Sequence, residues 1–177
     1  MQSDPLIPRR RSVRLKGFNY SQPGRYFLTI CTQNKEALFG RVQGHEVTLS
    51  RLGEIAEKCW LEIPTHFTQV ELIAHVIMPD HLHAIIALRQ QAASSLNLSA
   101  GDKPREFATP VSGSIATIVG VFKAAVSRRM HGADARCSGT IWQRGYYEHV
   151  IRSEQEFRNA WEYIRMNPAR HTFKQQS

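Results

Sequence analysis

Residues 75 to 87 read His-Val-Ile-Met-Pro-Asp-His-Leu-His-Ala-Ile-Ile-Ala. Apolar runs stand on both sides of Met78-Pro79-Asp80, and proline followed by aspartate is typical of a turn. We therefore predict two antiparallel strands, Val70 to Ile77 and His81 to Leu88, joined as a hairpin. The other predicted elements are arranged around this hairpin.

The second strand of the hairpin carries two histidines at alternate positions. Residues two apart in a strand point to the same face, so His81 and His83 should project side by side, about 7 Å apart at their α-carbons. Two imidazoles on one sheet can hold a metal ion. A histidine that alternates with apolar residues is more often a half-buried strand residue, so a third ligand and a reactive group must come from elsewhere in the chain.

The composition indicates a single basic domain. The chain has 177 residues, with 23 Lys and Arg against 15 Asp and Glu, a net charge of +8 and a pI near 9.8. This charge favours a polyanionic partner, nucleic acid first. Cys31, Cys59 and Cys137 lie far apart without zinc-site spacing, which fits a reduced compartment. No apolar run approaches the roughly 20 residues of a membrane helix, so we expect a cytoplasmic, nucleoid-associated protein without membrane contact.

Further elements follow from periodicity and from capping residues. The final helix is predicted to start after Ser153, with Glu156 at the capping-box position, and to end at Pro168. The helix over 114–130 has an apolar and a basic face. The remaining predicted elements are a strand from Tyr26 to Thr32, a short strand from His45 to Leu49, a helix from Arg51 to Glu62 that ends before Pro64, and a strand-like end to Thr140–Arg152.

The same pass along the chain predicts the domain organisation. Residues 1–16 form a flexible basic arm, either with no specific role or with nonspecific phosphate contacts. Residues 17–170 form one domain, in which 89–113 has no periodicity and is expected to be a mobile loop. Residues 171–177 form a tail.

Arginine interleaved with tryptophan and tyrosine indicates binding of single-stranded nucleic acid, because cations follow phosphates while rings stack on unpaired bases. The alternative is that Trp142 and the tyrosines belong to the core. The candidate DNA-binding residues are Arg9, Arg10, Arg11, Lys123, Arg128, Arg129, Trp142, Gln143, Arg144 and Arg165.

The last helix offers the missing groups. Tyr163 and Asn167 are four residues apart, so a nucleophile and a neutral oxygen ligand share one helical face. If that face lies over the two histidines, the ion would keep open positions for phosphate oxygens, and a phenol could attack a phosphodiester. Tyr146 and Tyr147 are competing nucleophiles without a ligand partner one helical turn away. His75 and His149 are expected to be structural or DNA-contacting residues.

Several segments resemble the single-tyrosine HUH transposases, and the REP-associated tyrosine transposases in particular. His81-Leu82-His83 is similar to their His-hydrophobic-His motif, and the similar segments run in family order from about residue 17 to residue 170. These segments are Phe27-Leu28-Thr29-Ile30-Cys31-Thr32-Gln33-Asn34, Met78-Pro79-Asp80-His81-Leu82-His83, Phe122-Lys123-Ala124-Ala125-Val126, the run from Ile141 to Arg152, and Tyr163-Ile164-Arg165-Met166-Asn167-Pro168.

The resemblance implies an α+β fold, a ferredoxin-like or RRM-like antiparallel sheet with helices on one face and the histidine motif on a central strand. It further implies that Tyr163 attacks a phosphate of single-stranded DNA, forming a 5′-phosphotyrosine and freeing a 3′-hydroxyl. Mg²⁺ or Mn²⁺ would be held by His81 and His83, with Asn167 as a further ligand. Asn167 stands where the insertion-sequence branch tends to have glutamine. Imidazole suits zinc, copper or iron better than magnesium, whereas manganese satisfies both arguments.

Three functions compete at this point. The first is a metal-dependent tyrosine transposase that nicks and rejoins single-stranded DNA at hairpin-forming repeats. The second is a domesticated, non-catalytic protein of the same fold that binds hairpin DNA or RNA. The third is a zinc hydrolase, for which only Asp80 is near enough to act as the general base. By the same resemblance the protein is expected to be a monomer or a homodimer.

Overall fold

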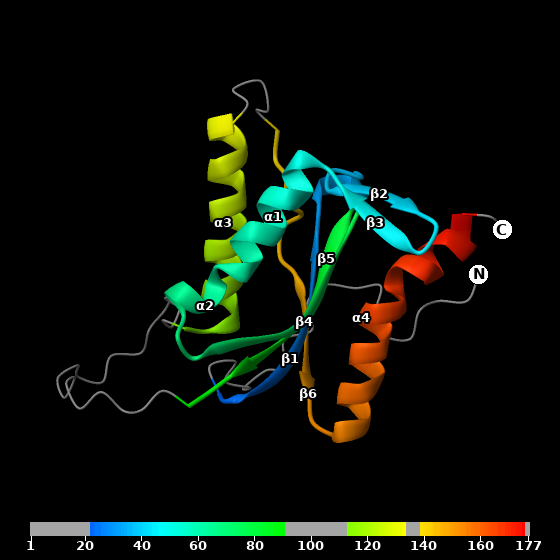
Figure 1. Cartoon of the computed structure of the whole chain (residues 1–177). Helices are drawn as coiled ribbons and strands as arrows, with labels where there is room; N and C mark the ends of the chain where they lie inside the picture. Colours follow the sequence, from blue (N-terminus) through cyan, green and yellow to red (C-terminus); the bar gives the residue numbers. More distant parts are fainter. Residues whose placement is uncertain (1–21, 91–112, 134–138, 176–177) are drawn as a thin grey trace.

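The computed structural model describes residues 22–90, 113–133 and 139–175, with side chains described up to residue 169. It is an α+β structure in which helices pack on a four-stranded antiparallel sheet (Figure 1). The elements are β1 (Gly24–Cys31), η1 (Gln33–Lys35), β2 (Gly40–Gln43), β3 (Glu46–Leu49), α1 (Arg51–Leu61), α2 (Ile63–His66), β4 (Val70–Met78), β5 (His81–Leu88), α3 (Ile115–Ala133), β6 (Tyr147–Ile151) and α4 (Glu154–Gln175). The predicted arm, with Arg9, Arg10 and Arg11, and residues 91–112 of the predicted loop lie outside the described residues.

The main sheet has the strand order β4-β5-β1-β6, and its neighbouring strands are antiparallel. The predicted hairpin is confirmed as β4 and β5. Because β5 lies between β4 and β1, the histidine motif stands on a central strand, as expected. The register pairs Thr29 with His83 and Cys31 with His81 across β1 and β5.

The two faces of the sheet are covered by different helices. The side chains of Leu82, Ala84 and Ile86 belong to a core shared with α1 and α3. Ile85 belongs to a second cluster, with Ile164 and other residues of α4. Figure 1 shows α1 and α3 on one side of the sheet and α4 on the other. The expectation of helices on a single face is therefore wrong, because the apolar side of α4 covers the face that carries the histidines.

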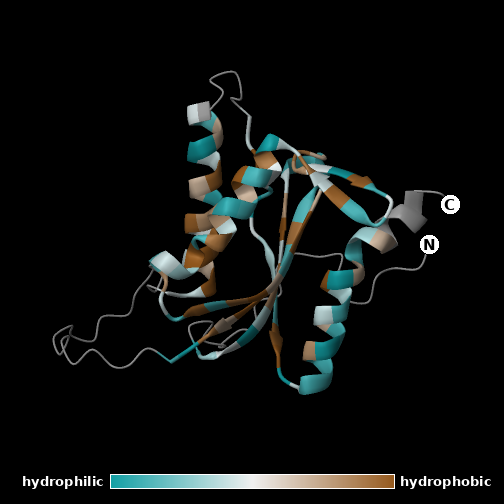
Figure 2. Cartoon of the chain, viewed as in Figure 1, coloured by the Kyte–Doolittle hydropathy of each residue, from teal (hydrophilic) through white to brown (hydrophobic). Residues whose placement is uncertain are grey.

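Residue type explains the local elements. The strands of the main sheet are largely apolar, whereas the coloured part of α4 carries both polar and apolar residues (Figure 2). At α1 the Ser50 hydroxyl accepts a hydrogen bond from the Gly53 amide at 3.1 Å, which satisfies one free donor of the first turn. Pro64 lies in the first turn of α2, a position where its missing N–H costs nothing.

The strand predicted at 45–49 forms a hairpin with a strand that the sequence pattern missed. β2 pairs with β3 as a separate two-stranded sheet. Gly40 opens β2 with φ +147, and a Cβ at this position would collide with the Thr48 carbonyl oxygen. Glycine alone tolerates this close approach of two backbones.

Helix α4 starts as predicted. The Glu156 amide donates to the Ser153 hydroxyl at 3.1 Å, and the Arg152 amide donates to the Glu156 carboxylate at 2.9 Å, which is a capping box. The predicted end at Pro168 is wrong, because α4 continues to Gln175 and takes up most of the predicted tail. Pro168 removes one intrahelical hydrogen bond, whereas the buried residues Tyr163, Ile164 and Asn167 hold the preceding turn on the sheet. None of the helices in the described part of the chain is long and apolar enough to cross a membrane.

Candidate active site

His81 and His83 project from β5 to the face that α4 covers. Their ring centroids are 4.4 Å apart, with an angle of 73° between the ring planes. His83 also stacks on Phe27 of β1, at 5.4 Å between centroids. The predicted geometry of two neighbouring imidazoles on one face of one strand is therefore present.

The Nδ1 atom of each imidazole forms a hydrogen bond with a nearby side chain. Nδ1 of His81 lies 2.5 Å from Oδ1 of Asp80, and Nδ1 of His83 lies 2.8 Å from Oγ1 of Thr29. A carboxylate can only accept, so Nδ1 of His81 donates to Asp80. This tautomer leaves the lone pair of His81 on Nε2. Metal-binding histidines commonly have such a partner on the second nitrogen, which orients the ring.

Charges near the pair keep Asp80 ionised and His83 neutral. Burial alone would raise the pKa of Asp80, but the hydrogen bond from His81 and the nearby charges of His81 and Lys35 outweigh it, so the pKa lies below its ordinary value. His83 is fully buried, and this burial holds its pKa well below the ordinary value, with the charges of His81 and Lys35 acting in the same direction. A neutral imidazole is the form that binds metal ions.

Tyr163 reaches the histidines from α4. Its hydroxyl lies 3.3 Å from Nε2 of His83, and the two rings meet edge to face at 5.0 Å between centroids. Its ring also meets Phe27 at 6.0 Å. Tyr163 is 6% exposed, and Asn167, one helical turn later, is 7% exposed. The structure thus places the predicted nucleophile beside the predicted metal site, with Asn167 on the same buried side of the helix.

These residues fit a divalent ion that takes part of its ligands from elsewhere. The candidate ligands are the Nε2 atoms of the two histidines and the amide oxygen of Asn167, and Nε2 of His83 faces the Tyr163 hydroxyl at 3.3 Å in this structure. Among the residues that the structure describes, no group of three or more His, Cys, Asp and Glu could enclose an ion. The expected ion, Mn²⁺ or Mg²⁺, stays a prediction for this site.

The competing tyrosines have other surroundings. Tyr146 donates a hydrogen bond from its hydroxyl to the carboxylate of Glu148 at 3.1 Å. Tyr147 lies half-buried on β6, opposite Thr29 of β1, and burial raises the pKa of its hydroxyl. Neither tyrosine stands on a helix with an amide one turn away. The preference for Tyr163 therefore stays a prediction that this geometry supports.

The other histidines singled out from the sequence lie away from the pair. Nε2 of His149 is 3.5 Å from the carboxylate of Glu156. Nε2 of His75 is 3.9 Å from the carboxylate of Glu57, and its ring leans on Trp60. Burial lowers the pKa of His75. Both histidines are paired with a glutamate at the distances given, and neither ring contacts His81 or His83 in the described structure.

Two predicted DNA-binding residues are engaged by contacts within the protein, Trp142 in the core and Lys123 at its edge. Trp142 is 7% exposed, packs between Phe39 and Phe122, and donates from its indole nitrogen to the Lys123 carbonyl at 3.1 Å. The alternative assignment of Trp142 to the core is therefore correct, and its ring is covered. Lys123 donates from Nζ to the carbonyls of Gln143 and Gly145, at 2.8 and 2.6 Å. Partial burial lowers the pKa of Lys123 to about 8.

The other predicted DNA-binding residues that the structure describes are on the surface. Arg128, Gln143 and Arg144 are exposed. Arg129 is exposed but paired with Glu62, at 2.5 Å between Nη2 and Oε2. Arg165 is exposed on α4, with its guanidinium 5.0 Å from the centre of the Trp161 ring. Contact of the exposed Arg128, Arg144 and Arg165 with phosphates stays a prediction.

Three residues of the site were not singled out from the sequence, namely Phe27, Thr29 and Asp80 as the partner of His81. Alternation along the predicted strand at 26–32 places positions 27 and 29 on one face. Only the register of β1 against β5 decides that this face is the one with the histidines.

The sequence was compared with family models and with other proteins. No protein-family model matches the sequence. An uncharacterized protein of Haemophilus influenzae is 42% identical over 166 residues, which cover 92% of this chain and 89% of that protein. The chain belongs to the same family as this Haemophilus protein. The similarity therefore extends over most of both chains.

A solved structure of a REP-associated tyrosine transposase bound to a REP hairpin matches with a TM-score of 0.58 at 19% identity, over 87% of this chain and 72% of that chain. The α+β class and the antiparallel sheet implied by the sequence resemblance are therefore confirmed, apart from the placing of all helices on one face. In this fold the predicted metal ligands and nucleophile lie between β5 and α4.

Proposed function

We propose that the protein is a metal-dependent, transposase-type DNA nickase and strand transferase that acts on single-stranded DNA at hairpin-forming repeats. The observation that carries this proposal is the contact between the Tyr163 hydroxyl and Nε2 of His83, with His81 adjacent. The shared fold with a transposase solved on a REP hairpin supports the choice of substrate.

In this proposal Tyr163 is the nucleophile. Its hydroxyl oxygen attacks the phosphorus and loses its proton, the bond from phosphorus to the 3′-oxygen breaks, and that oxygen takes up a proton as a free 3′-hydroxyl. The product is a 5′-phosphotyrosine. Rejoining reverses these steps with a 3′-hydroxyl as the attacking group, so no ATP is needed.

The chain's own residues prepare this attack. Edge-to-face contacts with Phe27 and His83 orient the Tyr163 ring, and its burial limits the access of water that could hydrolyse the covalent intermediate. Asp80 and Thr29 orient the two imidazoles. His81, His83 and Asn167 would hold the ion. When bound, Mn²⁺ or Mg²⁺ supplies positive charge that offsets the charge developing on the phosphate.

The two other functions are weighed against particular contacts. A zinc hydrolase needs a free carboxylate as general base, whereas Asp80 is engaged by His81 and lies 3.8 Å from the ammonium of Lys35. This disfavours the hydrolase. A non-catalytic hairpin-binding protein of the same fold remains the second candidate, and the observation that favours it is the occupation of Nε2 of His83 by Tyr163.

Covalent trapping separates the enzyme from the binding protein. The protein is incubated with Mn²⁺ or Mg²⁺ and a hairpin-bearing single strand from its own genomic flanks, labelled at the 5′ end or at the 3′ end. We expect the 3′-side fragment to become attached to the protein. Tyr163→Phe should abolish the adduct while hairpin binding persists, and Tyr147→Phe is the matched control that should retain it. Tight binding without any adduct favours the binding protein.

A further inference from the structure

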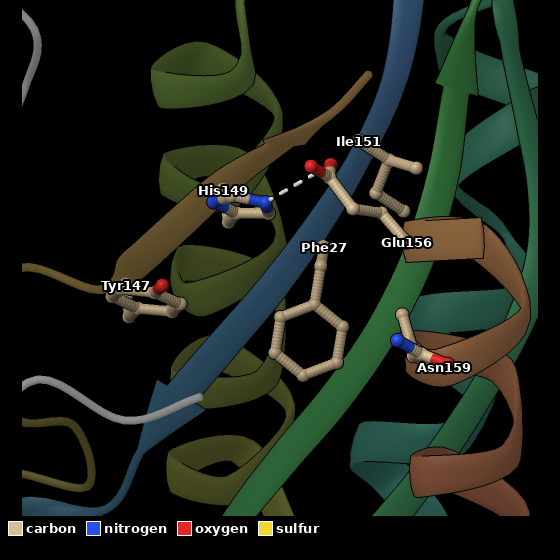
Figure 3. Close-up of a pocket in the computed structure, with 7 residues that line it drawn as sticks. Phe27, Tyr147, His149, Ile151, Glu156 and Asn159 are labelled. Carbon is tan, nitrogen blue, oxygen red and sulfur yellow. Dashed lines mark ion pairs between the residues drawn. The ribbon is translucent and has the colours of Figure 1, made fainter. Parts of the chain in front are cut away.

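A pocket opens beside the candidate active site, between the sheet and the first half of α4 (Figure 3). β1 and β6 form one wall, and α4 forms the other. Its lining residues are Phe27, Tyr147, His149, Ile151, Glu156, Asn159 and Ala160. The catalytic proposal above uses only Phe27 of this group.

Phe27 connects the pocket to the candidate nucleophile. Its ring lines the pocket, stacks on His83 at 5.4 Å and meets the Tyr163 ring at 6.0 Å. Asn159 precedes Tyr163 by one helical turn on α4. A strand whose phosphate lies at Tyr163 therefore has this pocket within reach of a neighbouring nucleotide.

The lining suits a flat, uncharged heterocycle. Figure 3 shows the rings of Phe27, Tyr147 and His149 around one hollow, with the Asn159 amide at its side. Phe27 is only 3% exposed, so the rings accessible for stacking are those of Tyr147 and His149. Aromatic side chains bind unpaired bases by stacking, whatever the sequence. The Asn159 oxygen accepts a hydrogen bond from Gln155 at 2.9 Å, which holds the amide and leaves its nitrogen to donate to a ligand.

The charge at the rim argues against a phosphate in the pocket. The Glu156 carboxylate accepts from the Arg152 amide at 2.9 Å and lies 3.5 Å from His149. These contacts hold the pKa of Glu156 below its ordinary value, the Arg152 amide contributing first. A fixed anion at the rim repels phosphate but tolerates a neutral base.

We propose that this pocket receives one unpaired nucleobase of the DNA strand, from a nucleotide next to the phosphate that Tyr163 attacks. The proposal rests on the proposed function for its substrate class. Tyr147 and His149 contact the ring of the base, and the Asn159 amide donates to an acceptor on its edge.

An abasic scan tests this directly and does not require cleavage. A series of hairpin-bearing strands replaces each unpaired nucleotide beside the hairpin, one at a time, by an abasic site, and affinity is measured by fluorescence anisotropy without metal. In the wild type we expect one position to lose at least about fivefold in affinity, the size of one base-stacking contact. The Asn159→Ala variant should bind the intact strand more weakly than the wild type does. The abasic site at that position should then lower the affinity of the variant by a clearly smaller factor than it lowers that of the wild type.

Three further variants keep the test specific. Tyr147→Phe retains the ring and should behave as wild type. Tyr147→Ala should, like Asn159→Ala, reduce the abasic penalty; this dependence of the penalty on the pocket residue is the coupling that the test measures. Gln43→Ala removes an exposed amide on β2 and should change neither affinity nor coupling. Thermal unfolding confirms that each variant is folded; Asn159 is exposed, so its replacement should leave the melting temperature almost unchanged.

Each outcome decides the inference. An abasic penalty of equal size in wild type and Asn159→Ala, or no position with a distinct penalty, overturns the pocket as a base site. If covalent adducts form while this coupling is missing, the pocket proposal fails and the proposed function stands. If coupling is present while no adduct ever forms, the base pocket stands and the catalytic proposal fails.

Discussion

The hydroxyl of Tyr163 lies 3.3 Å from Nε2 of His83, although the two residues are 80 positions apart in the chain. The same nitrogen is the atom of His83 that remains for a metal ion, because Nδ1 faces Thr29. If an ion binds the histidines as we propose, phenol and ion would compete for this one position, and the Tyr163 side chain would have to leave the nitrogen.

This competition predicts that Tyr163→Phe binds Mn²⁺ more tightly than the wild type. Removing the hydroxyl removes one hydrogen bond to Nε2, whose net worth of roughly 0.5–1.5 kcal/mol corresponds to a gain of about two- to tenfold. Isothermal titration with Mn²⁺, without DNA, measures the change, and Tyr147→Phe is the control that should leave the affinity unaltered. Weaker binding by Tyr163→Phe would mean that the phenol oxygen is itself a ligand.

A second prediction concerns the carboxylate behind His81. Asp80→Asn replaces the carboxylate, which can only accept hydrogen bonds, with a neutral amide. The His81 imidazole should then be less well oriented and less basic. We expect Mn²⁺ affinity to fall by about 10- to 100-fold, the usual effect of losing such a partner. Glu57→Gln is the control, since the Glu57 carboxylate lies 3.9 Å from a histidine outside the site, His75. Equal losses in the two variants would contradict the assignment.

The surface cations give a third prediction, on salt dependence. Arg144 is exposed, whereas Lys123 is bound to two backbone carbonyls. If Arg144 contacts a phosphate, Arg144→Ala should lower the salt slope of single-strand binding by about 0.7. Lys123→Met should reduce thermal stability and leave that slope unchanged. Anisotropy titrations at several salt concentrations measure both slopes, and a slope that falls only in the lysine variant would reverse the assignment.

Lys123 also gives a pH prediction. Partial burial lowers its pKa from 10.5 to about 8 in the folded protein. Between these two pH values the unfolded chain keeps a proton that the folded chain has released, so this group makes the free energy of unfolding rise with pH. Urea titrations at pH 8, 9 and 10 should show a steeper rise for the wild type than for Lys123→Met. Parallel pH profiles for the two proteins would show that the ammonium is not desolvated.

Much of the fold was open to prediction from local pattern. The β4–β5 hairpin, the Ser50 cap of α1 and the capping box of α4 each depend on residues within a few positions of one another. The errors arose where neighbours in space decide. Trp142 looked like a base-stacking residue, but it is covered by Phe39 and Phe122, which come from two other segments. Pro168 looked like a helix end, but the helix continues to Gln175, and the turn before the proline is held by the buried residues Tyr163, Ile164 and Asn167.

The sequence by itself determined that His81 and His83 share one face of a strand, and that Tyr163 and Asn167 share one face of a helix. Both follow from the fixed repeats of the two backbone conformations. Only the tertiary structure decided that these two faces meet. The apolar side of α4 packs on Phe27 and Ile85, on the sheet face opposite α1 and α3, and this packing brings Tyr163 to His83. Burial of apolar surface between distant segments selects that arrangement, and no local pattern encodes it.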